Sequence, residues 1–72
     1  MDTKQQLTPA ALRARIAETR VRQWRVAQRL DVSAVHLSHV LVERISADAT
    51  ELASIADAIE AEFMSAAAGA TA

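Results

Sequence analysis

The residues best equipped for chemistry are arginines and histidines that gather in one part of the chain. Seven arginines and three acids lie between positions 13 and 44, a net charge of +4, whereas five acids and no Lys or Arg lie from position 45 onward. Guanidinium groups match phosphate oxygens with a planar fork of donors, so a basic segment favours a polyanionic partner. We expect one face for a polyanion and an acidic face turned away from it. A chance charge split on a solvated surface is the alternative.

Other kinds of site lack the side chains they need. The chain has no Cys, which excludes disulfides, thiolate metal sites and cysteine nucleophiles. His36 and His39 are spaced as a ligand pair, but no cysteine or nearby carboxylate completes a set, so we expect no metal and no cofactor. There is no Ser/His/Asp arrangement, phosphate-cradling glycine loop or carboxylate pair in a cleft. We predict that the protein is not an enzyme and has no small-molecule substrate.

Length and composition limit the fold. Seventy-two residues make one small domain, and 51% hydrophobic content with one Gly, one Pro and two aromatic residues indicates an all-α protein. No segment approaches the roughly 20 apolar residues of a membrane span, and the N-terminus lacks the pattern of a signal peptide. We therefore expect a cytoplasmic protein with no membrane partner.

Capping residues and apolar spacing predict a compact bundle of four to five short helices. Thr8, Ser33 and Asp48 are favourable N-caps, and Glu51 follows Asp48 at the spacing of a capping box. The expected helices are Pro9 to Thr19, Gln23 to Leu30, Ala34 to about Glu43, and Ala49 to about Phe63. Residues 9–63 would form the domain, with a flexible N-terminus over 1–8 and a flexible alanine-rich tail over 64–72.

The break between the first two helices is inferred from register, because no Gly, Asn or Pro marks it. The stripe of Leu12 and Ile16 leads to Arg20, whereas Val26, Ala27 and Leu30 begin a new apolar set. One helix from Pro9 to Leu30 is the alternative. In the fourth helix we expect one apolar face, formed by Leu52, Ile55, Ala56, Ile59 and Phe63.

The segment from Arg22 to Val42 has the spacing of two helices that cross steeply. Ala27 is small enough for close approach, and a helix-turn-helix joins its helices at roughly 90–120°. The segment closely resembles the helix-turn-helix of the Cro and phage-repressor (XRE-type) family of transcriptional regulators, and LASIADAI from Leu52 to Ile59 resembles that family's next core helix. The matching residues are Gln23, Val26, Ala27, Leu30, Val32, Ser33, Leu37 and Val40. Asp31 departs from the usual turn glycine, and Val21-Arg22 from the usual polar cap.

The resemblance implies that the third helix, Ala34 to about Glu43, enters the major groove of DNA with its N-terminal residues toward the bases. The base-facing positions would be Ala34, Val35, Ser38 and His39. The backbone-facing positions would be Arg22, Gln23, Arg25, Ser33, His36 and Arg44. For the arginines and histidines, a merely solvated surface is the alternative. If the histidines face DNA, protonation adds positive charge there, and binding should tighten at lower pH.

The resemblance further implies sequence-specific binding of double-stranded DNA by a transcriptional regulator, a repressor or Cro-like protein of a phage or prophage. Its place would be the bacterial or phage-infected host cytosol, and its partner a second copy, at least on DNA. The alternative is a protein-interaction module, antitoxin-like or an adaptor, that uses the acidic fourth helix and the tail. Trp24 would either cover the joint with the first helix or contact the sugar-phosphate backbone or a partner protein.

Overall fold

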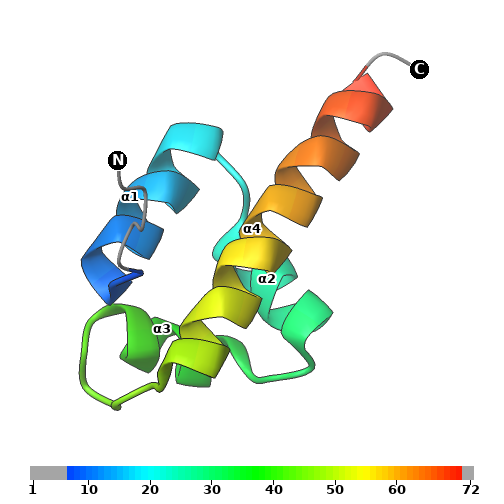
Figure 1. The fold of residues 1–72 in the computed structure, drawn as a ribbon. Helices are drawn as coiled ribbons and strands as arrows, with labels where there is room; N and C mark the ends of the chain where they lie inside the picture. Colours follow the sequence, from blue (N-terminus) through cyan, green and yellow to red (C-terminus); the bar gives the residue numbers. More distant parts are fainter. Residues whose placement is uncertain (1–6, 71–72) are drawn as a thin grey trace, which may run out of the picture.

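The fold, taken from a computed structural model that describes residues 7–70, confirms the all-α prediction. Within this range there are four helices and no strand (Figure 1). None of these helices has the length and apolar character needed to cross a membrane. The flexibility expected for positions 1–6 and 71–72 concerns residues outside the described range. The helices are α1 (Pro9–Thr19), α2 (Gln23–Leu30), α3 (Ala34–Leu41) and α4 (Ala49–Ala70).

The predicted N-caps act as expected at α1, α3 and α4. Thr8 Oγ1 accepts a hydrogen bond from the Ala11 amide at 3.1 Å, and Ser33 Oγ accepts one from the His36 amide at 3.0 Å. Asp48 Oδ1 accepts from the Glu51 amide at 2.8 Å. The reciprocal half of the expected capping box is missing, because the Glu51 carboxylate binds the side chain of His36 instead. The starts of α1, α3 and α4 are thus set by the side chain of the residue immediately before each helix, whereas α2 begins after Arg22 without a side-chain cap.

Helices α1 and α2 end at a residue other than glycine in the left-handed conformation, Arg20 (φ 61°) and Asp31 (φ 59°), and Glu43 (φ 65°) takes this conformation two residues after α3. The Arg20 amide bonds to the Ile16 carbonyl at 2.8 Å and closes α1, which confirms the predicted break there. After Asp31, the Val32 amide bonds to the Ala27 carbonyl at 3.1 Å and turns the chain toward α3. These bonds satisfy carbonyls at the helix ends that would otherwise lack a partner.

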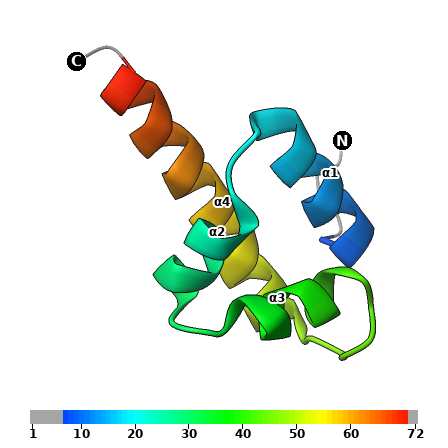
Figure 2. The same cartoon turned by 180° about the vertical axis from the view of Figure 1, so that it is seen from behind.

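The core lies between the helices, with α4 packed against α1 and α2 and with α3 packed against the same two helices (Figure 2). Val26 and Ala27 from α2 are fully buried against α3, and Leu12 comes from α1. Burying apolar side chains of this size contributes about 1.5–3 kcal/mol each. The buried hydrophobic residues are Leu12, Val26, Ala27, Leu37, Val40, Leu41, Leu52, Ile55, Ala58 and Ile59.

Two predicted helix ends and one predicted position of the apolar face are wrong. The third helix stops at Leu41 instead of Glu43, because Glu43 turns left-handed and the Arg44 amide bonds to the His39 carbonyl at 2.8 Å. Helix α4 continues past Phe63 to Ala70, through a run of alanines with high helix propensity. Phe63 is 38% exposed, whereas Ala56 is half-buried against the core as expected, and Ala58 is buried as well.

The left-handed residue between α2 and α3 gives a first test. We expect Asp31→Val to lower the free energy of unfolding by about 1–2 kcal/mol, because a β-branched side chain fits a left-handed residue poorly. Asp31→Asn should leave it almost unchanged, since Asn tolerates this conformation as Asp does. Urea unfolding of both variants measures the difference. Equal losses in both variants would contradict a conformational cause.

Candidate nucleic-acid interface

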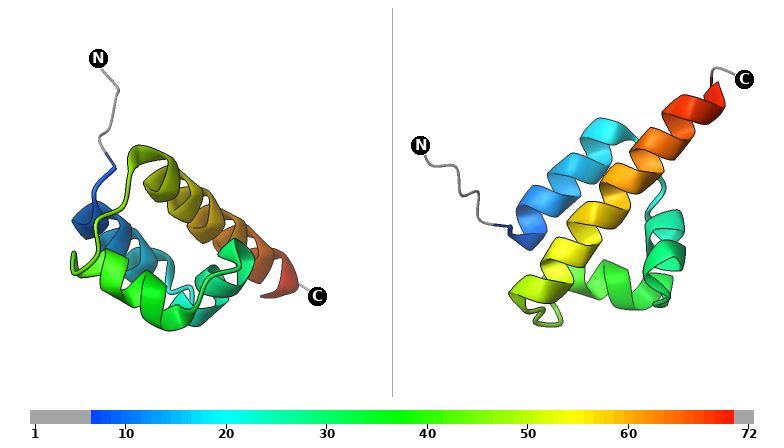
Figure 3. Two further views of the ribbon diagram at one scale, coloured as in Figure 1. Left: turned by 90° about the horizontal axis from the view of Figure 1, so that it is seen from below. Right: turned by 45° about the vertical axis from the view of Figure 1, so that its right-hand side comes forward.

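A surface groove runs along the joint between α1 and α2 and the exposed side of α3. Helices α2 and α3 meet at an angle, and α2 also packs beside α4 (Figure 3). The groove brings together all four residues predicted to face bases and two of those predicted to face the DNA backbone. Its lining residues are Arg20, Val21, Arg22, Gln23, Trp24, Ala34, Val35, Ser38 and His39.

The α3 side of this groove is small, apolar and weakly polar. Ala34 and Val35 lie in the first turn, and Val35 is 64% exposed although it is a large apolar residue. Ser38 and His39 are half-buried one turn later and carry the hydrogen-bonding atoms of this side. The opposite side supplies two guanidinium groups and the amide of Gln23. The groove therefore has one weakly polar side, formed by α3, and one strongly basic side, formed by the joint between α1 and α2.

Sequence reasoning left Arg20 out of the site. Its left-handed backbone ends α1, and its side chain lines the groove beside Arg22. Nothing in the local sequence marks an arginine as a helix end. The position of Arg20 in the groove could therefore be predicted only if the end of α1 was known. Trp24 also lines the groove and remains 49% exposed, with the Arg25 guanidinium 5.5 Å from its ring centroid. Trp24 thus lies beside the α1–α2 joint and is open to solvent.

Four predicted backbone-facing residues lie outside the groove. His36 Nε2 is 2.9 Å from Glu51 Oε2, so its ring is engaged with α4. Ser33 uses its hydroxyl to cap α3 and remains exposed. Arg44 is exposed in the segment that follows α3. Arg25 is bound to Glu62 of α4.

Glu62 is the one buried charged residue between positions 7 and 67, with 7% of its surface exposed. Its two oxygens accept hydrogen bonds from Arg25 Nε at 3.1 Å and from Arg29 Nε at 2.6 Å. The bond from Arg29, followed by that from Arg25, holds the pKa of Glu62 below its ordinary value, although burial opposes this shift. One carboxylate therefore fixes two arginines of α2 against α4.

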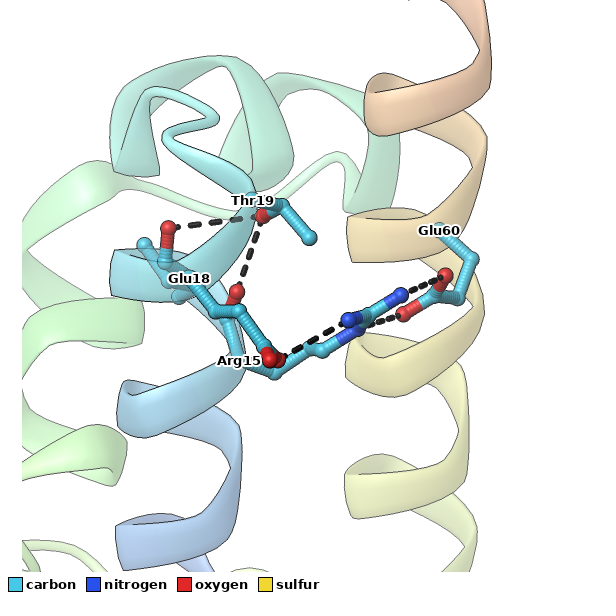
Figure 4. Close-up of polar contacts among 5 residues, drawn as sticks. Arg15, Glu18, Thr19 and Glu60 are labelled. Carbon is cyan, nitrogen blue, oxygen red and sulfur yellow. Dashed lines mark hydrogen bonds and ion pairs between the residues drawn. The ribbon is translucent and has the colours of Figure 1, made fainter.

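A second carboxylate of α4 joins it to α1. Glu60 receives two hydrogen bonds from Arg15, one from Nε at 2.5 Å and one from Nη2 at 2.8 Å (Figure 4). The Arg15 guanidinium also lies 5.7 Å from the centre of the Phe63 ring, and these bonds lower the pKa of Glu60. The expectation of an acidic face turned away from the arginines is therefore wrong for Glu60 and Glu62, because both reach back to bind arginines.

Ion pairing also separates the arginines into two groups. Arg15, Arg25 and Arg29 are paired with carboxylates. Arg13 donates from Nη1 to the Leu41 carbonyl at the end of α3. Within residues 7–70, the structure shows no ion pair for the three remaining arginines, which are Arg20, Arg22 and Arg44. Two of these three line the groove, so its basic edge keeps its charge.

Comparison with protein-family models, with curated proteins and with solved structures finds no match to this chain. Among the residues whose placement is described, no three His, Asp or Glu side chains lie close enough to share a metal ion. The proposals that follow therefore depend on the chain's own residues and geometry.

The Glu62 bridge predicts a pH-dependent contribution to stability. Folding lowers the pKa of Glu62, so the contribution is complete above the unfolded carboxyl pKa of about 4.3 and is lost as the pH falls through the lower folded value. We expect Glu62→Gln to lower the unfolding midpoint at pH 7, and the gap from the unmodified chain to close in acid.

Thermal unfolding of both proteins from pH 7 to about pH 2.5 measures this gap. Asp57→Asn is the matched control, because Asp57 is an exposed carboxylate of the same helix with no ion pair to residues 7–70. A difference in unfolding midpoint that stays constant with pH would show that the charge of Glu62 does not stabilise the contact between α2 and α4.

Proposed function

We propose that this protein binds double-stranded DNA in a sequence-specific manner through a helix-turn-helix formed by α2 and α3, and acts as a transcriptional regulator. The observation that carries the proposal is the groove, where the exposed first turn of α3 lies beside Arg20 and Arg22, two arginines that have no ion pair among residues 7–70. Base edges are read by side chains and phosphates are held by cations, so an interface to duplex DNA needs both kinds of surface together.

The reading side favours particular base contacts. Ala34 and Val35 are exposed apolar residues that suit the methyl group of thymine. Ser38 can bond to either kind of base edge, and His39 can donate to the acceptors of guanine. Bidentate readers such as Arg or Asn are absent from the exposed face of α3. Specificity per base is therefore modest, and the shape of the DNA supplements it.

Arg20, Arg22 and Gln23 line the groove together with α3 and would contact backbone phosphates beside an inserted α3. Unpaired guanidinium groups bind phosphate with the release of counterions, which gives affinity that falls steeply with salt. His36 makes its contact with Glu51 and is not part of the proposed interface. Arg44 is exposed beyond the end of α3 and would reach an adjacent phosphate.

The resemblance to the Cro and phage-repressor family extends the proposal to a repressor or Cro-like protein of a phage or prophage, acting in the cytoplasm. Few base contacts per copy favour a homodimer on two half-sites, about one helical turn apart. Linking two weak sites in this way raises affinity without any new contact to the bases.

Selection of bound duplexes from random sequences tests the proposal. We expect an enriched motif, which disappears in the double variant Ser38→Ala with His39→Ala, because these side chains carry the polar contacts of α3. Ser54→Ala is the control, since Ser54 is exposed on α4 and lies away from the groove. No enriched sequence with the unmodified chain would overturn specific DNA binding.

A second function, a protein-interaction module of the antitoxin or adaptor kind, is favoured by one observation. Phe63 and Met64, in the last part of α4, are 38% and 66% exposed. Against it, Glu60 and Glu62 are already bound to arginines of the same chain and offer less charge to a partner. DNA affinity that hardly changes between about 50 and 200 mM salt would favour this second function.

A further inference from the structure

A second pocket, of about 310 Å³, lies next to the groove where the α1–α2 joint meets α4. Three arginines converge on it, two from the joint and one from α2, and α4 contributes a serine. The pocket and the groove share Arg20, Val21 and Arg22, so the two are continuous. Its lining residues are Arg20, Val21, Arg22, Arg25, Glu62, Ser65 and Ala66.

Arg25 binds Glu62 in a way that leaves its own terminal Nη groups available as donors. A guanidinium has five N–H donors, and the bond to Glu62 is made by Nε alone. Within residues 7–70, no hydrogen bond occupies either Nη atom of Arg25, and half of its side chain is exposed. Glu62 therefore holds this arginine in a fixed orientation and leaves the Nη groups for a second acceptor.

The charge balance of the pocket favours an anion. Three guanidinium groups face one carboxylate, and that carboxylate is shared with Arg29, which does not line the pocket. Arg20 and Arg22 have no ion pair among residues 7–70, and both are exposed. At roughly 30 Å³ for each water, the pocket has room for about ten waters, which is enough for a hydrated oxyanion.

We propose that this pocket is a phosphate-binding site, formed by Arg20, Arg22, Arg25 and Ser65 and oriented by Glu62. The phosphate expected there is a backbone phosphate of a DNA strand as it leaves the groove, a source that rests on the proposed function. The site extends the DNA-contacting surface from α2 and α3 onto α4. Ser65 offers a hydroxyl donor, which complements the charge of the arginines.

The salt dependence of DNA binding tests the site with a closely matched pair. Arg25→Gln and Arg29→Gln each remove one charge and one bond to Glu62, but only Arg25 lines the pocket. Losing one phosphate contact should reduce the slope of log affinity against log salt by about 0.9 in Arg25→Gln. That change makes the loss between 50 and 200 mM salt about 3.5-fold smaller. Arg29→Gln should keep the slope of the unmodified chain. Equal slopes in all three proteins would overturn the site while leaving DNA binding intact.

Titration of the free protein with inorganic pyrophosphate separates this site from the proposed function. In nitrogen–proton spectra we expect saturable shifts at the side chains of Arg20, Arg22 and Arg25, which are lost in Arg20→Gln and kept in Arg29→Gln. Shifts without any binding of DNA would keep the phosphate site and overturn its DNA source. The absence of shifts, together with unchanged salt slopes, would overturn the site itself. Unfolding midpoints confirm that each variant is folded.

Discussion

The close contact between α2 and α3 at Ala27 is the constraint on which the rest of the structure depends. Ala27 is almost fully buried beside Val26, and both belong to the same buried cluster as Leu37 and Val40 of α3. A larger side chain at this position would need space that the packed interior does not have, because overpacking a core moves the backbone. The position of α3, and with it the exposure of Val35, follows from one small residue.

Ion pairs then add to the stability that the small core provides. A domain of this size gains limited stability from apolar burial alone, and here carboxylates of α4 reach both neighbouring helices: Glu60 binds α1 and Glu62 binds α2. Along the sequence, the arginines and these acids lie in two segments of opposite net charge, but in the fold they bind one another. After folding, the acids of α4 neutralise only some arginines, and the groove keeps its positive edge. A formal net charge of −1 therefore does not describe the surface that a partner meets.

Local signals in the sequence predicted the starts of α1, α3 and α4, whereas the break between α1 and α2 was predicted only from the register of their apolar residues. The local signals act over one turn, through residues such as Thr8 and Ser33 whose side chains cap the amides that follow. The end of α3 could not be predicted in this way, because Glu43 takes a left-handed conformation that usually indicates glycine. The groove residues of α3 were predicted from the resemblance to the helix-turn-helix family, which implies that the N-terminal part of this helix is exposed to a partner. The engagement of His36 with Glu51 was not predicted, since it joins residues of two helices whose relative placement the sequence does not state.

The bond from Arg13 to the last carbonyl of α3 connects the first helix directly to the third. It places a cation at the carboxyl end of α3, where the helix dipole is negative, and it fixes that end relative to α1. If α3 reads DNA, its tilt in the groove is set from both ends, by the turn at Asp31 and by α1. A genetic screen for lost binding would then recover substitutions at Arg13 among those at contact positions, although this side chain is engaged within the protein. The distance of a residue from DNA would therefore be a poor guide to whether the domain tolerates its substitution.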